Sequence, residues 1–208
     1  FLLFFLNYLF ESYQKESPLS QTFNATLILS ILSFFYPNII LLFLLIIITG
    51  VNYGNINWRM LSCALLGAFL PYIFYFVYAD FYNLIFTIPD FTIWEFMLIP
   101  DFKNCPTTKL IWIATLCLIS FLSFMELFRW LYKKSIRSRK SFTIILFYFI
   151  VTLYISMLED AYSAYYCLSP LSIVIANYFT YTKQRKIANI LFMLLIFSSF
   201  AYRYLIVI

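Results

Sequence analysis

KLIWIATLCLISFLSFMELFRW, residues 109–130, is the stretch that decides the fold of this chain. A lysine opens it, a glutamate and an arginine lie near its end, and the residues between are apolar or weakly polar. An α-helix needs about 20 predominantly apolar residues to cross the hydrocarbon core of a bilayer. The stretch therefore predicts a membrane-spanning helix, and the basic segment 131–140 that follows predicts where it leaves the membrane.

Apolar runs of similar length lie on both sides of this helix. We expect an all-α, polytopic transmembrane helix bundle of about six to seven membrane helices. The other predicted spans are residues 17–35, 38–49, 61–79, 141–158, 167–181 and 187–208. Nothing repeats at a fixed period, so residues 1–208 are interpreted as a single integral membrane domain. The chain opens within an apolar run and without a methionine, and we expect further helices upstream.

Two segments between the spans need separate interpretation. Tyr36-Pro37 interrupts residues 17–49, which form either a hairpin of two helices or one long kinked span, since proline breaks the helical hydrogen-bond ladder. The near-span length of residues 17–35 favours the hairpin. Residues 91–99 are apolar but too short to cross, and Trp94 predicts one interfacial segment at the outer surface.

Composition and charge agree with a membrane protein. Hydrophobic residues make up 64% of the 208 residues and charged residues 11%, whereas soluble domains carry about 25% charged residues. The net charge of +5 comes mostly from the segments 131–140 and 182–186. Because lysine and arginine favour the cytoplasmic side, both basic loops are predicted to be cytoplasmic. This charge indicates contact with membrane lipids and not with nucleic acid.

The composition also excludes several kinds of site. The chain has no histidine, which excludes histidine-based triads, histidine-bound zinc and haem with a histidine ligand. Its three glycines form no phosphate-binding loop. The four cysteines have no metal-ligand spacing, so we expect no metal and no cofactor, and whether Cys105 and Cys167 form a disulfide is left open.

Charged residues near the spans are the remaining candidates for chemistry. Glu126 and Arg129 lie three residues apart and predict an intramembrane ion pair, or a pair that reaches the interface at a helix end. Glu159, Asp160 and Arg203 are predicted to share the outer leaflet. A carboxylate base with an arginine that grips phosphate would suit a transferase. The alternative is a solvated acidic turn with an arginine anchoring a helix end.

Three stretches together resemble a known family. They are Phe34-Phe35-Tyr36-Pro37, the segment from Asn57-Trp58-Arg59-Met60 to Leu70-Pro71-Tyr72, and the segment from Ser169-Pro170 to Ala176-Asn177-Tyr178-Phe179. Their order and spacing are similar to an uncharacterised family of multi-pass inner-membrane proteins from Bacteroidota. The resemblance covers most of the chain and implies a bacterial inner membrane, but it implies no activity.

Three functions remain open. The favoured hypothesis is a non-enzymatic subunit, an accessory or scaffold component of a larger inner-membrane complex, with membrane lipids and partner membrane proteins as its contacts. The first alternative is a membrane transferase acting on lipid-linked sugar at the outer leaflet. The second is a small-solute transporter, for which Pro71 and Pro170 would mark broken helices. The substrate, the partner and the oligomeric state are not predicted.

Overall fold

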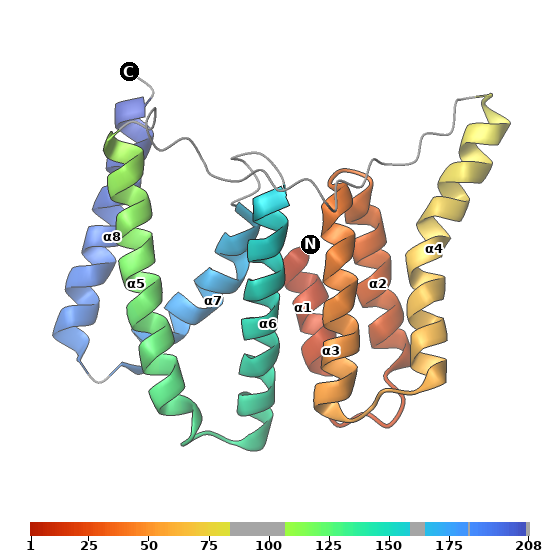
Figure 1. Ribbon diagram of the computed structural model, residues 1–208, viewed down its shortest axis with the longest axis horizontal. Coiled ribbons are helices and arrows are strands. Elements are labelled where there is room, and N and C mark those ends of the chain that lie inside the picture. Colours follow the sequence, from red (N-terminus) through yellow and green to blue (C-terminus); the bar gives the residue numbers. More distant parts are fainter. Residues whose placement is uncertain (84–106, 159–164, 183, 207–208) are drawn as a thin grey trace. The chain divides into compact units, whose positions relative to one another are not determined.

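The described part of the chain is helical throughout. The computed structural model describes residues 1–83, 107–158, 165–182 and 184–206, and every regular element in these ranges is a helix (Figure 1). This confirms the all-α class predicted from the apolar runs. The elements are α1 (Leu2–Glu11), α2 (Leu19–Ser33), the 3-10 helix η1 (Pro37–Leu42), α3 (Phe43–Tyr53), α4 (Trp58–Phe81), α5 (Thr107–Leu131), α6 (Ile136–Leu158), α7 (Tyr165–Tyr181) and α8 (Arg185–Ile206).

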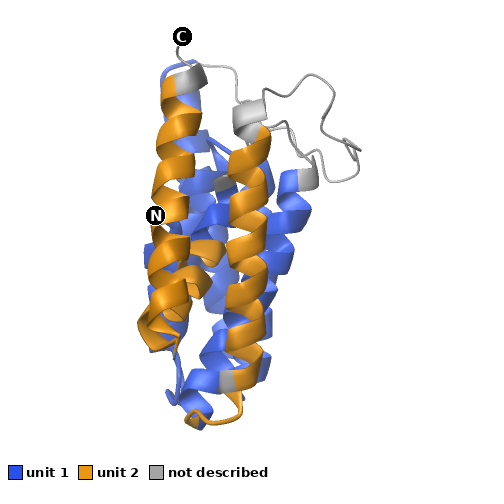
Figure 2. Ribbon diagram, turned by 90° about the vertical axis from the view of Figure 1, so that its left-hand side faces the viewer, with its two compact units in different colours: residues 1–97, 136–169 blue, residues 98–135, 170–208 orange. Residues whose placement is uncertain are grey.

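The helices form two compact units, which Figure 2 shows in different colours. Unit 1 comprises residues 1–97 and 136–169, and so holds α1 to α4, α6 and the start of α7. Unit 2 comprises residues 98–135 and 170–208, and so holds α5, the rest of α7 and α8. A single membrane domain over residues 1–208 stays a prediction.

Residues 17–49 form a hairpin, which resolves the alternative left open by the sequence. The helix α2 ends at Ser33, and Pro37 begins η1, which leads directly into α3. Figure 1 shows α2 and α3 side by side, joined by the turn at one end. The turn forms because proline has no N–H with which to continue the helix and restricts the residue before it.

The helix α2 packs against α4 through small side chains. Its buried face consists of Thr22, Ala25, Thr26, Leu29, Ser30 and Ser33. On α4, Ala64 and Gly67 are buried at this contact side. Ser30 Oγ donates to the carbonyl of Ala68 at 2.5 Å, and Ser33 Oγ lies 2.6 Å from the hydroxyl of Tyr72. Small residues and interhelical hydrogen bonds are the usual means by which helices associate in lipid.

The rest of unit 1 is held by aliphatic packing around α6. Ile144, Tyr148 and Ile155 of α6 are fully buried. The helices η1 and α3 contribute fully buried aliphatic side chains of their own, namely Ile39, Leu42, Leu45 and Ile46. The helix α6 begins within the predicted basic loop, so Arg137, Arg139 and Lys140 lie in its first turns.

Unit 2 is held by contacts between α5 and α8. Trp112 Nε1 donates to Ser199 Oγ at 3.2 Å, and the indole stacks on the ring of Tyr202 with centroids 5.0 Å apart. Thr115 Oγ1 donates to Ser198 Oγ at 3.1 Å. A buried cluster of Ile119, Tyr178, Ala188 and Leu191 joins α5, α7 and α8. Polar pairs and an apolar cluster therefore both hold this unit.

Four of the described helices are long and apolar enough to cross a membrane. They include α4 complete and most of α5, α6 and α8, with candidate windows Trp58–Phe81, Leu110–Arg129, Ile136–Ser156 and Arg185–Tyr204. Among the described residues this is fewer than the six to seven membrane helices predicted. The other three predicted spans correspond to shorter helices. They are α2 with 15 residues, η1 followed by α3, and α7 with 17 residues. At 1.5 Å per residue, a helix of 15 residues is shorter than the hydrocarbon core of about 30 Å.

The predicted helix breaks do not interrupt helices. The helix α4 continues through Pro71, and α7 continues through Pro170. Proline is tolerated inside membrane helices because neighbouring groups satisfy the freed carbonyl. The predicted interfacial segment, residues 91–99, lies outside the described residues.

Candidate functional site

A polar end of unit 1 forms where the last residues of α3, just before the loop 54–57, meet the start of α6. Asn52 Nδ2 donates to the carbonyl of Lys140 at 3.0 Å, and the hydroxyl of Tyr53 lies 3.5 Å from Ser141 Oγ. These contacts bring Arg59, which follows the loop, to the same end of unit 1 as the basic residues of α6.

An aromatic and cationic stack extends this polar end. The rings of Tyr13 and Tyr53 meet edge to face with centroids 5.0 Å apart, and the guanidinium of Arg137 lies 5.6 Å from the centroid of Tyr13. Tyr53 lies beyond the apolar part of α3. Burial raises the pKa of its phenol above the ordinary value, and the hydrogen bond with Ser141 and the charge of Arg137 oppose that rise. The raised pKa keeps the phenol protonated at neutral pH.

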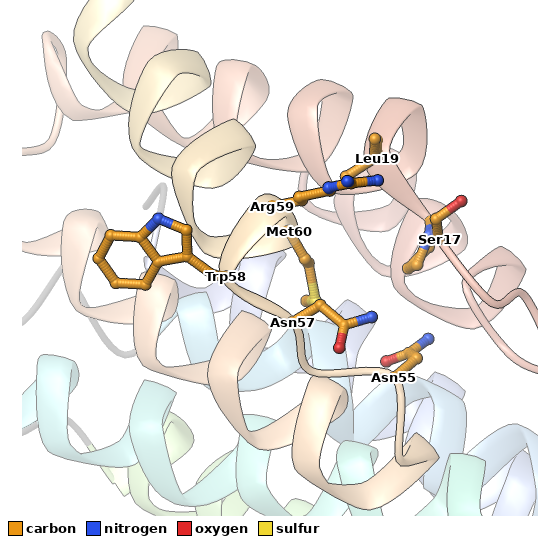
Figure 3. A pocket seen from close by; sticks show the side chains of 8 residues that line it. Ser17, Leu19, Asn55, Asn57, Trp58, Arg59 and Met60 are labelled. Carbon is orange, nitrogen blue, oxygen red and sulfur yellow. The ribbon is translucent and has the colours of Figure 1, made fainter.

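A cavity of about 370 Å³ opens at the first turns of α2 and α4 (Figure 3). Ser17, Pro18 and Leu19 line it from the start of α2, and the loop before α4 with the first turn of α4 lines the other side. In Figure 3 the guanidinium of Arg59 reaches toward Leu19 and Ser17, while the ring of Trp58 points away from them. The cavity thus has one formal positive charge at its wall and no carboxylate among its lining residues.

Asn55 forms the buried part of this cavity wall. The residue is only 8% exposed, and its Nδ2 donates to the carbonyl of Ser12 at 2.9 Å. That bond fixes the orientation of the amide. Asn55 Oδ1 is buried and accepts no hydrogen bond within the described residues. A buried acceptor without a donor costs about 1–3 kcal/mol, so this atom marks a position where a donor would be stabilised.

The exposed apolar side of α4 is a second candidate surface. We name it the α4 outer face and define it by its exposed apolar side chains, Leu65, Leu66, Phe69, Ile73, Phe74, Phe76, Val77 and Phe81. A shallow, almost entirely apolar groove of about 540 Å³ lies along its C-terminal half. The groove is lined by Phe74, Val77 and Phe81, with Tyr75, Tyr78 and Tyr82 beside them. This surface can bind apolar side chains or acyl chains. Among the residues that line the groove, only the tyrosines carry an ionisable group.

The structure places only some of the predicted site residues. Glu126 is partly buried and Arg129 exposed, both on α5, and the ion pair between them stays a prediction. Arg203 is exposed in the last turn of α8. Glu159 and Asp160 lie outside the described residues, so the predicted grouping with Arg203 stays a prediction as well.

The described cysteines are free thiols and form no metal site. Cys167 is a free thiol whose Sγ lies 3.6 Å from Ser156 Oγ, and Cys105 lies outside the described residues. Among residues 1–83, 107–158, 165–182 and 184–206, no group of three histidine, cysteine or acidic side chains could hold a metal ion.

Sequence reasoning missed the cavity at Arg59. Asn57 and Arg59 were used only as part of a stretch that resembles a known family, although Asn52, Asn55 and Asn57 beside an arginine at a helix start were a usable signal. The partner Ser12 lies 43 residues before Asn55 in the chain. No local pattern predicts a contact at that separation.

The comparisons with known proteins identify a family and no activity. No curated protein and no solved structure matches the chain. The family match extends over residues 1–208, which is the whole chain. The protein belongs to DUF6427, a family of unknown function.

Proposed function

We propose that this protein is a non-enzymatic integral membrane subunit, a scaffold or accessory component of a larger complex in the inner membrane of Bacteroidota. The observation that carries the proposal is the one-sided packing of α4. Its inner side packs on α2 through Ala64 and Gly67, while the α4 outer face leaves large side chains such as Phe69 and Phe74 exposed.

The shape of the α4 outer face supports a protein partner. Ridges of side chains on one helix pack into grooves on another, and this is how membrane helices recognise each other. The groove beside Phe74 and Phe81 is such a depression. A belt of aromatic residues at the membrane surface accounts for tyrosines such as Tyr78 and Tyr82 near the end of α4. It does not account for Phe69, which lies in the middle of the helix.

The proposed orientation has the basic loops 131–140 and 182–186 in the cytoplasm. The contacts of Asn52 and Tyr53 with the start of α6 support it, because they group Arg59 with Arg137, Arg139 and Lys140. The end of α4 that carries Phe81 then faces the outer side. The partner surface consequently runs along most of α4, from Leu65 to Phe81.

We expect the double substitution Phe74→Ala with Phe81→Ala to reduce co-purification of partner proteins in mild detergent at least tenfold. Truncating an anchoring aromatic residue at an interface costs more than about 1 kcal/mol, and two such losses exceed the 1.4 kcal/mol that corresponds to a factor of ten. Phe74 and Phe81 are 67% and 79% exposed, so their loss leaves the fold intact. The measurement is quantitative mass spectrometry of proteins retained with a tagged chain.

The matched control is Phe121→Ala with Phe197→Ala in unit 2. These side chains are 65% and 74% exposed, so the control removes the same amount of apolar surface from α5 and α8. Equal loss of partners in both double variants would show that removing any two exposed phenylalanines lowers co-purification, whichever helix carries them. A monodisperse monomer that retains no partner and turns over a lipid substrate would end the proposal.

The two alternatives have their own tests. A transferase that uses Asp160 and Arg203 loses function in the separate variants Asp160→Asn and Arg203→Gln at normal expression. Full complementation of a deletion strain by both variants would refute it. A small-solute transporter would show uptake in proteoliposomes. Both alternatives stay predictions.

A further inference from the structure

The cavity at Arg59 joins two helix ends that share one electrostatic property. The first residue before α2 is Pro18 and that before α4 is Asn57, and neither makes a side-chain hydrogen bond to its helix. The first N–H groups of a helix have no acceptor within the helix, and the helix dipole places partial positive charge there. Residues of both first turns line the cavity, so two uncapped helix starts face the same space.

Arg59 adds a full positive charge to these partial charges. Its guanidinium reaches across the cavity toward Leu19 and Ser17 in Figure 3. A guanidinium binds phosphate through two parallel hydrogen bonds, and helix N-termini are common binding sites for phosphate groups. None of the residues lining the cavity carries a negative charge. The cavity is therefore suited to an anion of the size of a phosphate diester.

A ligand with a hydrogen-bond donor would satisfy the buried acceptor of Asn55. The Asn55 side chain is more than nine-tenths buried, its Nδ2 is held by Ser12, and its Oδ1 has no partner within the described residues. A fully ionised phosphate offers this oxygen no proton. An ammonium or hydroxyl group attached close to the phosphate would satisfy it. A ligand that contacts both Arg59 and Asn55 must therefore carry a phosphate and a hydrogen-bond donor close together.

The location of the cavity points to a lipid as the source of this chemistry. The cavity lies at the first turn of α4, one of the helices long enough to cross a membrane, and so at headgroup depth. Trp58 is 81% exposed at the same turn and suits an interfacial anchor, while Leu19 and Met60 give the cavity an apolar wall. A volume of about 370 Å³ falls within the range of about 300–1,000 Å³ typical of small-molecule sites.

We propose that this cavity binds the headgroup of a membrane phospholipid whose phosphate diester carries an ammonium or hydroxyl donor, the chemistry of phosphatidylethanolamine and phosphatidylglycerol. The phosphate lies between the two helix starts with Arg59, and the donor reaches Asn55 Oδ1. The site is independent of the α4 outer face, and it holds a lipid on the side of the membrane where the basic loops lie.

The test is lipid binding to delipidated protein in a non-ionic detergent, followed by native mass spectrometry and by the shift of the thermal unfolding midpoint. The probes are phosphatidylethanolamine, phosphatidylglycerol, phosphatidylcholine, inorganic phosphate and glycerol 3-phosphate. Phosphatidylcholine keeps the phosphate but has no N–H or O–H donor. We expect it to bind at least tenfold more weakly than the first two lipids. Equal binding of phosphatidylcholine would overturn the role of Asn55 and the proposal with it.

The soluble probes separate a lipid from a free phosphate compound. We expect neither inorganic phosphate nor glycerol 3-phosphate to shift the unfolding midpoint at concentrations where the lipids saturate. Tight binding of either one, without a gain from acyl chains, would overturn the assignment to a lipid.

Two variants locate the binding at the cavity. We expect Arg59→Gln to weaken binding of both lipids about tenfold or more, because it removes a charge-assisted contact. The control Arg139→Gln removes the same charge from an exposed position at the start of α6, and we expect it to bind as the wild type does. Equal losses in the two variants would show nonspecific attraction to a basic surface and would refute the site.

Asn57→Asp guards against a variant that misfolds. Aspartate caps a helix as well as asparagine does and suits the positive end of the helix dipole, so the unfolding midpoint without lipid should not fall. The new carboxylate lies in the cavity wall and repels phosphate. We expect at least a tenfold loss of lipid binding, and unchanged binding would refute the proposal.

Discussion

Gly67→Leu is expected to lower the free energy of unfolding by about 3 kcal/mol, the upper part of the usual range for overpacking a tight contact. A Cβ atom at Gly67 would collide with Thr26 Oγ1 and would lie 2.9 Å from the carbonyl oxygen of Phe23. The second neighbour is backbone, so it moves only if α2 moves. The leucine must therefore push α2 away from α4 and break the contacts of Ser30 and Ser33 with α4.

The measurement is the unfolding midpoint and free energy of the purified protein in detergent. Leu66→Phe is the matched control, because it adds volume one residue away at an exposed position. We expect it to leave the stability unchanged. In the background of Gly67→Ala, the substitution Thr26→Gly should restore part of the lost stability by removing the nearest clashing atom. A Gly67→Leu protein as stable as the wild type would contradict the close approach of α2 and α4.

Trp112→Ala is expected to have the second largest effect, a loss of about 2 kcal/mol in unit 2. The substitution removes the hydrogen bond to Ser199 and the stacking on Tyr202. Interhelical hydrogen bonds in membranes contribute about 0.6 kcal/mol on average, and an aromatic pair adds about 0.5–1.5 kcal/mol. Truncation also leaves a void between α5 and α8. In lipid the two helices are held by packing contacts and not by the hydrophobic effect, so the lost contacts lower the stability directly.

Trp112→Phe separates the two contributions. Phenylalanine keeps a ring against Tyr202 and loses only the hydrogen bond to Ser199, so the expected loss is below about 1 kcal/mol. Denaturant titrations followed by circular dichroism give both values. If alanine and phenylalanine at position 112 cost the same, the stacking with Tyr202 contributes nothing, and the described contact between α5 and α8 is wrong.

Much of the fold follows from local features of the chain. The run 109–130 is helical because only internal hydrogen bonds satisfy the backbone in hydrocarbon, and α5 covers it. Pro37 ends the preceding helix and turns the chain, as the length of the run before it indicated. Gly67, one of the three glycines of the chain, lies buried against α2.

The lengths of the shorter helices were not predictable in the same way. Hydropathy does not show where a helix ends when the flanking residues are apolar as well. The run 17–35 therefore looked nearly long enough to cross, whereas α2 begins after Pro18 and stops at Ser33. The other two short segments, 38–49 and 167–181, were counted as spans although each was already shorter than about 20 residues, and the helices there are also shorter than the four long ones.

The sequence alone determined the helical class and the apolar character of the long helices, because each depends on the composition of a single segment. Only the tertiary structure decided which helices meet and which polar groups share a space. Asn55 meets the carbonyl of Ser12 across 43 residues, and Arg59 faces the start of α2. Contacts of this kind depend on close packing between helices, such as that of Gly67 against α2. That packing requires suitable residues on α2 and on α4 together, which no single segment of sequence reveals.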